Sequence, residues 1–246
     1  MTHILRFTFL LGFSFVLFTT STFAHSSNKV EKAKYFLKPN QMPDPTKYLP
    51  PVPSVKDPIF FNDSVVYEEG KRLRGTERGK LAVADTSITL RYIMQRFGAV
   101  MDCDFTPENY PQVADFLFRT YATARHGITG AKDFYHRQRP YQYFHESTPV
   151  PNKEHPDDWT SYPSGHTIRY WTAALLLASI DPEHQNEIYQ VGYELGQSRT
   201  IVGFHYQSDI DAARLIAGTA FARLAGLRQW QKAYKKAYKE FWNKKR

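Results

Sequence analysis

Three short blocks of the sequence combine basic residues with histidine or aspartate. The first is AKDFYHRQRP, with Lys132 and Arg139, and the second is SYPSGHT, which contains His166. The third is SRTIVGFHYQSD, with His205 and Asp209. Imidazole can act as a nucleophile or move protons near neutral pH, and clustered cations attract anions. The blocks therefore indicate chemistry on a bound anion, provided that the fold brings them together.

In the first block, Lys132 and Arg139 are seven residues apart. On one helix this spacing brings their side chains within about 20° of the same face, where both can reach one anion. Arg137 would then lie about 200° away from Arg139, and we interpret it as a solvated or structural cation. Pro140 is predicted to end this helix. Taken alone, such a pair is typical of a solvated helix face.

In the second block, Ser164 and Gly165 stand at a predicted helix start. Free backbone N–H groups and the positive end of the helix dipole favour a bound oxyanion there. His166 lies in the same first turn. The alternative is that Ser164 only caps the helix and that the backbone satisfies His166.

In the third block, an unbroken helix would place Arg199 and His205 about 240° apart, so that they could not share a ligand. A helix break is predicted at Gly203, which frees His205 to turn toward Arg199. Asp209 can then accept a hydrogen bond from one imidazole nitrogen and leave the other as a nucleophile or base. The alternatives are that Arg199 complements a helix C-terminus and that Asp209 complements a helix N-terminus.

A cluster of histidines with an aspartate also resembles a metal site. Here, however, each histidine block carries arginine or lysine, which repels a divalent cation and attracts an anion. We therefore predict a site with no metal ligands and no cofactor.

The elements that must position these blocks are helices. The chain has 246 residues, of which 42% are hydrophobic, so it is long and apolar enough to bury a core. Apolar residues recur with helical period in NDSVVYEEGKRLRG, in TERGKLAVADTSITLRYIMQRFG and in NYPQVADFLFRTYATARHG, each of which ends at a glycine. Period-two strand patterns are nearly absent. We predict an all-α fold, with one helical-bundle domain at 59–227.

Several helix boundaries in the second half of the chain can be predicted. Ser164 caps a helix that runs to about Ile180, and Asp181 followed by proline opens the next helix. Ser208 and Asp211 have the spacing of a capping box for the helix after that.

The N-terminal segment has two parts. An apolar run at 7–18, followed by small and polar residues up to Ala24, is typical of a signal peptide, so we predict cleavage after residue 24 and export to a bacterial periplasm. The alternative is an uncleaved membrane anchor, for which the run is short. Seven prolines between Pro39 and Pro58 predict an extended arm at 25–58. Cys103 is the single cysteine, which excludes an internal disulfide.

The C-terminal residues 228–246 form a predicted basic amphipathic helix, in which Trp230, Tyr234, Tyr238 and Phe241 recur at helical spacing. We expect it to pack as a terminal helix, and weak association with an anionic envelope is the alternative. This segment and Arg6 account for the whole formal charge of +8, so residues 25–227 are formally neutral. The high isoelectric point is therefore no argument for an anionic substrate.

Taken in order, the blocks resemble a known signature. Lys132-x6-Arg139-Pro140, Pro163-Ser164-Gly165-His166 and Ser198-Arg199-x5-His205-x3-Asp209 resemble the three-part motif of the superfamily that joins type 2 phosphatidic acid phosphatases, class A nonspecific acid phosphatases and vanadium haloperoxidases. The leader, the length and the SYPSGHT context are most similar to the bacterial class A acid phosphatases. Thr160 departs from that group, which usually has glycine there.

The resemblance implies an exported acid phosphatase that hydrolyses phosphomonoesters of broad range without a metal, through a phosphohistidine. It implies catalytic roles for His205, His166 and Asp209 and phosphate binding by the remaining motif residues, Lys132, Arg139, Ser164, Gly165 and Arg199. Tyr162 and Trp159 are candidates to stack on nucleoside or aryl groups. No nucleic-acid partner is implied, and a homodimer is compatible with the family. The alternatives are a vanadate-dependent haloperoxidase and a non-catalytic exported anion-binding or envelope module.

Overall fold

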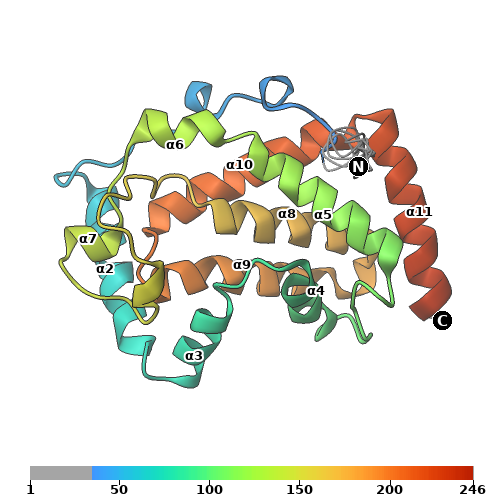
Figure 1. Ribbon diagram of the computed structural model, residues 1–246, viewed down its shortest axis with the longest axis horizontal. Helices are drawn as coiled ribbons and strands as arrows, with labels where there is room; N and C mark the ends of the chain where they lie inside the picture. Colours follow the sequence, from blue (N-terminus) through green and yellow to red (C-terminus); the bar gives the residue numbers. More distant parts are fainter. Residues whose placement is uncertain (1–34, 246) are drawn as a thin grey trace, which may run out of the picture. The chain divides into compact units, whose positions relative to one another are not determined.

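The computed structural model describes residues 35–245, which are arranged around helix α8 (Gly165–Ile180) (Figure 1). Helix α9 (Gln185–Ile201) packs on one side of α8, and helices α5 (Pro111–His126) and α10 (Gln207–Ala225) pack on the other. Because neighbours cover it on several sides, α8 is apolar almost all round, as GHTIRYWTAALLLASI requires. The described residues contain no β-strand, and the predicted all-α class is confirmed.

Further helices and short turns complete the described part of the chain. The remaining helices are α2 (Pro58–Leu73), α3 (Glu77–Ala84), α4 (Leu90–Gly98), α6 (Thr129–Tyr135), α7 (Pro140–Tyr143) and α11 (Arg228–Lys245). Short 3₁₀ turns are η1 (Pro39–Gln41), η2 (Pro45–Lys47), η3 (Pro151–Lys153) and η4 (Pro182–His184). None of the described helices is both long and apolar enough to cross a membrane.

The segment 35–57 precedes the first described helix and contains only the turns η1 and η2. It is tied to the helices by its side chains and carbonyls: the Tyr48 hydroxyl lies 2.9 Å from the Thr219 hydroxyl, and Tyr162 donates to the Pro50 carbonyl. The predicted leader at 1–24 and the first residues of the predicted arm lie outside the described residues.

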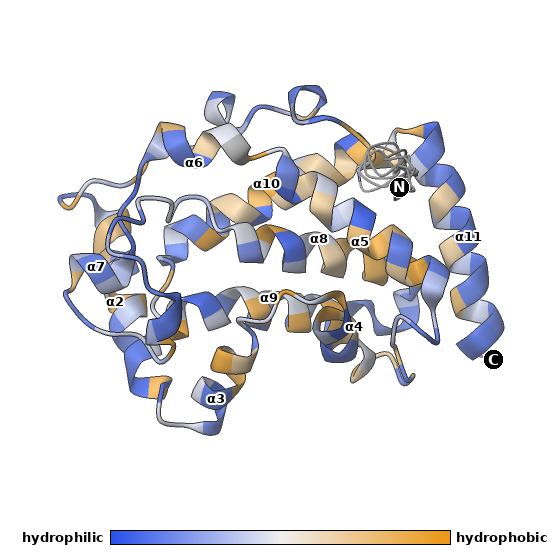
Figure 2. Ribbon diagram, in the orientation of Figure 1, coloured by the Kyte–Doolittle hydropathy of each residue, from blue (hydrophilic) through white to orange (hydrophobic). Residues whose placement is uncertain are grey.

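Helix α11 packs against α5 (Figure 2). In the figure α11 is mainly hydrophilic, whereas the first turns of α5 beside it are hydrophobic. Trp230, Ala237 and Phe241 of α11 are buried, whereas Tyr238 is exposed, and the Trp230 indole donates to the Thr120 hydroxyl. Lysines occupy the exposed faces, so the helix contributes apolar area to the core and positive charge to the surface.

Two predicted helix starts differ from the observed ones. The segment TERGKLAVADTSITLRYIMQRFG forms two helices, because Thr89 caps α4 after a break at Asp85. Asp181 makes no side-chain cap and precedes η4, so the regular helix begins only at Gln185. The Asp181 carboxylate instead accepts from Lys245 of α11. In both places the aspartate accepts a hydrogen bond from a side chain that is distant in the sequence, Ser198 for Asp85 and Lys245 for Asp181. Local spacing does not reveal such partners.

Candidate active site

The prediction that Lys132 and Arg139 share one helix is wrong. Helix α6 ends at Tyr135, and His136 takes a left-handed conformation with φ of 44°. The chain then runs extended, and Arg139 lies at the N-cap position of α7, which Pro140 opens rather than ends. The two side chains meet nevertheless, because both donate to the carbonyl of Thr160.

The second block starts α8 as predicted. Ser164 is the N-cap, and its hydroxyl accepts the backbone N–H of Thr167, so this residue does cap the helix. Gly165 and His166 follow in the first turn, where backbone N–H groups are available to an anion. The Ser164 N–H donates to the Asp209 carbonyl at 3.1 Å, which ties the start of α8 to the start of α10.

The third block turns at Gly203, as predicted. Helix α9 ends at Ile201, and Gly203 has φ of 79°, a conformation that favours glycine. The chain then turns back, so that the backbone N–H of His205 donates to the Arg199 carbonyl. Helix α10 begins at Gln207, and Asp209 rather than Asp211 closes its first turn by accepting the Tyr206 N–H. The predicted Ser208 capping box is wrong for this reason.

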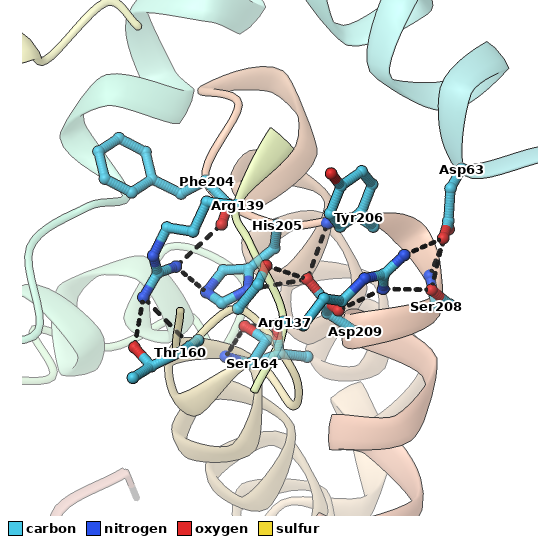
Figure 3. Close-up of polar contacts among 12 residues, drawn as sticks. Asp63, Arg137, Arg139, Thr160, Ser164, Phe204, His205, Tyr206, Ser208 and Asp209 are labelled. Carbon is cyan, nitrogen blue, oxygen red and sulfur yellow. Dashed lines mark hydrogen bonds and ion pairs between the residues drawn. The ribbon is translucent and has the colours of Figure 1, made fainter. Parts of the chain in front are cut away.

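Asp209 holds His205 at the centre of the site (Figure 3). Its Oδ2 atom lies 3.3 Å from Nδ1 of His205 and also accepts the Ser161 hydroxyl at 2.6 Å. Both Asp209 and His205 are buried, and Nε2 of His205 points toward the Arg139 guanidinium, 3.2 Å from Nη1. The imidazole is thus fixed by one nitrogen, and its other nitrogen faces a cation.

Arg137, which the sequence left as either a solvated or a structural cation, is a structural one. It is buried, and it donates to Oδ1 of Asp209 at 2.6 Å and to Oδ2 of Asp63 at 2.8 Å (Figure 3). Its guanidinium also lies 3.8 Å from the Tyr206 ring centroid. Asp63 in turn accepts the N–H and hydroxyl of Ser208. The buried series from Asp63 to His205 therefore joins α2, the loop before α7, and α10 with the loop before it, and no local pattern around Asp63 indicates its part in it.

Arg139 is anchored on several sides. It donates to the Asp158 carboxylate at 2.6 Å, to the Phe204 carbonyl at 2.9 Å and to the Thr160 hydroxyl at 3.2 Å. Thr160, which departs from the usual glycine, thus adds a contact to the cation instead of disturbing the loop. Charge pairing with Arg139 lowers the pKa of Asp158 to about 2, although burial opposes this. Asp158 stays ionised in mild acid as a result.

Arg199 has no such partner. Its side chain is 3% exposed, and its Nε and Nη1 atoms are buried without any hydrogen bond among the described residues. Burial lowers its pKa to about 10. Next to it, Ser198 donates to the buried carboxylate of Asp85, which also accepts from Arg96. A buried, unsatisfied guanidinium is costly, and an anion is the partner that removes the cost.

Burial, together with the positive charge of the site, lowers the pKa values of its histidines and its lysine. Burial, with a contribution from Arg139 that Asp209 opposes, lowers the pKa of His205 to about 3. Burial and the charge of Arg199 lower the pKa of His166 well below its usual value. Burial, with Arg139 and Arg125 nearby, lowers the pKa of Lys132 to about 7. Without an anion, both imidazoles are therefore neutral in mild acid.

The two aromatic residues that were candidates to stack on a substrate differ in their exposure. Tyr162 is 1% exposed and its hydroxyl is bonded, so the prediction that it stacks on a substrate is wrong. Trp159 is 40% exposed and stacks on the His136 ring at 5.0 Å. Among the described residues, no three His, Cys, Asp or Glu side chains are grouped as metal ligands.

Comparison with known proteins places this constellation in a family. Residues 116–233, which include all the predicted site residues, match the PAP2 superfamily. The chain is 39% identical over 211 residues to the non-specific acid phosphatase of Providencia stuartii, covering 84% of each chain. It is 36% identical over 212 residues to the non-specific acid phosphatase of Salmonella typhi, covering 83% of each. The chain belongs to the class A non-specific acid phosphatases of the PAP2 superfamily.

The acid phosphatase of Zymomonas mobilis is a more distant relative, 30% identical over 200 residues that cover 80% of this chain and 75% of the relative. Membership of the class A non-specific acid phosphatases makes this protein a phosphomonoester hydrolase.

Proposed function

We propose that this acid phosphatase acts through a covalent phosphohistidine on His205. The observation that carries the proposal is the fixed imidazole: Nδ1 lies against Asp209, and Nε2 is neutral and faces Arg139. A neutral nitrogen held in one orientation is the state that attacks phosphorus. The bond from Nε2 to phosphorus forms as the ester P–O bond breaks, and Asp209 stabilises the charge that the imidazole gains.

The cations and the helix start hold the phosphoryl oxygens. Arg199 supplies two unsatisfied donors, and the Gly165 N–H lies at the N-terminus of α8. Lys132, Arg139 and the Ser164 hydroxyl complete the set around the same Thr160–Asp209 region. During transfer, negative charge is spread over the three equatorial phosphoryl oxygens. Donors that already point at these oxygens therefore stabilise the transition state.

His166 moves the proton in both steps. In the first step it donates to the leaving alkoxide, and in the second the neutral imidazole takes a proton from water while hydroxide attacks phosphorus and the N–P bond breaks. Burial and nearby cations lower the pKa of His166, so its imidazole is neutral before the substrate binds. The negative charge of a bound phosphate offsets those cations, so the proton is acquired together with the substrate, which favours activity in acid.

We also propose that catalysis is independent of metal ions and broad in its choice of alcohol. Arginine and lysine surround the histidines, which disfavours binding of a divalent cation. The proposed binding contacts are all made to the phosphate, so little of the binding depends on the leaving group. The leader-like residues 1–24 support export to the periplasm, where cleavage would make His25 the first residue. The exposed lysines of α11 support weak, salt-sensitive association with an anionic envelope.

The proposal is tested with p-nitrophenyl phosphate in mild acid. Hydrolysis should resist EDTA and be inhibited by vanadate, and His205→Ala should lose about 10³-fold or more in kcat. His184→Ala is the matched control, because His184 lies at the opposite end of α9 from Arg199 and is bonded to Asp181. Loss of activity in EDTA that zinc or magnesium restores would contradict metal independence.

A further inference from the structure

Two arginines beside the start of α8 have no part in the chemistry above. Arg125 lies in the last turn of α5, and Arg169 lies one turn into α8. Both are half-buried, and neither forms an ion pair with any carboxylate in the described part of the chain. Among residues 35–245, the Nε atom of Arg125 is buried without a hydrogen-bond partner, and Arg169 donates to the Gly165 carbonyl at 3.3 Å.

Both guanidinium groups lie against the same residue. A Cβ atom placed on Gly165 would be 2.7 Å from Nε of Arg125, so this arginine covers the open side of the glycine. Arg169 reaches the carbonyl of the same glycine from the next turn of the helix. Helices α5 and α8 pack side by side, which brings the two cations together from different elements (Figure 1).

Arg125 and Arg169 lie close to His166. Arg169 follows His166 by three residues, which puts the two side chains on one face of α8 about one turn apart. The positive charge of Arg169 contributes to the lowered pKa of His166, and that of Arg125 contributes to the lowered pKa of Lys132. In the proposed mechanism His166 protonates the leaving alkoxide, so Arg169 lies one helix turn from the group that contacts the leaving alcohol.

Two neighbouring cations without carboxylates are stabilised by an anion. Burial lowers the pKa of both arginines, and that of Arg125 is lowered further by Arg169. The phosphate being cleaved already has Arg199, Lys132 and Arg139, so the additional pair is available for a second negative group. Guanidinium recognises carboxylate and phosphate with two parallel donors, which gives geometric selectivity as well as attraction.

We propose that Arg125 and Arg169 form a second anion subsite on the leaving-group side, which favours phosphomonoesters whose alcohol part carries a carboxylate or another phosphate. The inference rests on the proposed function, because it uses the direction in which the leaving group departs past His166. It adds a preference to a broad specificity: neutral alcohols are accepted, and anionic ones bind more tightly.

The test compares 3-phosphoglycerate with glycerol 3-phosphate, which share one carbon skeleton and differ by a carboxylate in place of a hydroxymethyl group. Fructose 1,6-bisphosphate with fructose 6-phosphate gives the corresponding comparison for a second phosphate. In the Arg125→Gln/Arg169→Gln double variant, the ratio of kcat/KM for the anionic over the neutral substrate should fall about tenfold, mostly through KM. Raising the ionic strength should reduce the same ratio in the unsubstituted enzyme.

The control is Lys235→Gln/Lys239→Gln, which removes the same charge from exposed positions of α11. It should leave the ratio unchanged. A ratio that falls equally in both double variants, or in neither, overturns the subsite. Failure of the unsubstituted enzyme to hydrolyse any of the four esters overturns the proposed function instead, so the two failures are distinguishable.

Discussion

Replacing Arg137 with glutamine removes the cation that joins Asp209 to Asp63. The side chain is 6% exposed and donates to the two carboxylates at 2.6 and 2.8 Å. Breaking a buried ion pair by removing one partner costs about 3–5 kcal/mol, because the remaining charge is left uncompensated. With two carboxylates stranded, we expect Arg137→Gln to lower the free energy of unfolding near neutral pH by the upper part of that range.

The dependence on pH gives the sharper expectation. Arg137 is the main cause that lowers the pKa of Asp209, against burial, which raises it. A carboxyl whose pKa is lowered by folding contributes stability above its unfolded pKa of about 4 and loses it as pH falls through the folded value. Without Arg137 the folded pKa rises, so the deficit of the variant should be larger near pH 7 than near pH 4.

Activity should follow the same titration. A protonated Asp209 no longer accepts from Nδ1 of His205, so the acid limb of kcat/KM should move to higher pH in Arg137→Gln. Each unit by which the pKa of Asp209 exceeds the assay pH lowers the ionised fraction about tenfold. The assay is the profile of kcat/KM between pH 3 and 8 with p-nitrophenyl phosphate, alongside urea unfolding at pH 4 and 7.

Asp181→Asn is the matched control for this prediction. Asp181 is also fully buried and accepts from Lys245 at 2.7 Å, but it lies at the far end of α8 from Ser164. It should lose stability without moving the acid limb. If Arg137→Gln loses stability and its acid limb stays where that of Asp181→Asn does, the reasoning on Asp209 is refuted.

Three further predictions concern single side chains. Gly203→Ala should lose about 1–3 kcal/mol of stability and most activity, because its φ is 79° and a Cβ would meet Arg74 at 2.6 Å; thermal unfolding and kcat check this. Trp230→Ala should cost about 3–5 kcal/mol in urea unfolding while kcat of the folded fraction stays unchanged, since Trp230 packs on α5. His166→Ala should slow alkyl phosphates about 10²–10⁴-fold and p-nitrophenyl phosphate much less, because the better leaving group needs no proton; equal losses would contradict an acid role.

The sequence predicted the parts of the site that local rules determine. Ser164 caps α8, and Gly203 turns the chain between α9 and α10. Both could be predicted because a cap and a left-handed residue depend on only a few neighbouring residues. The pairing of His205 with Asp209 also followed from a spacing of four residues together with that break. These residues could be assigned to the site before the fold was known.

The remainder depends on contacts that are distant in the sequence. The helix through Lys132 stops at Tyr135, and just beyond it Arg137 pairs with Asp63 and Asp209, which are 74 and 72 residues away. The start of α10 was misplaced for a similar reason, since Asp209 serves the Tyr206 N–H, His205 and Arg137 together. Helical periodicity describes one segment at a time and cannot detect a partner on another segment.

Trapping the covalent intermediate tests the central claim most directly. The enzyme is mixed with a ³²P-labelled phosphomonoester in acid-buffered solution, quenched with alkali within one turnover, and digested for peptide mapping. The account predicts alkali-stable, acid-labile label on the peptide that contains His205, and no label in His205→Ala, with His184→Ala labelled like the unsubstituted enzyme. Label on another residue, or hydrolysis by His205→Ala at the unsubstituted rate, would contradict it.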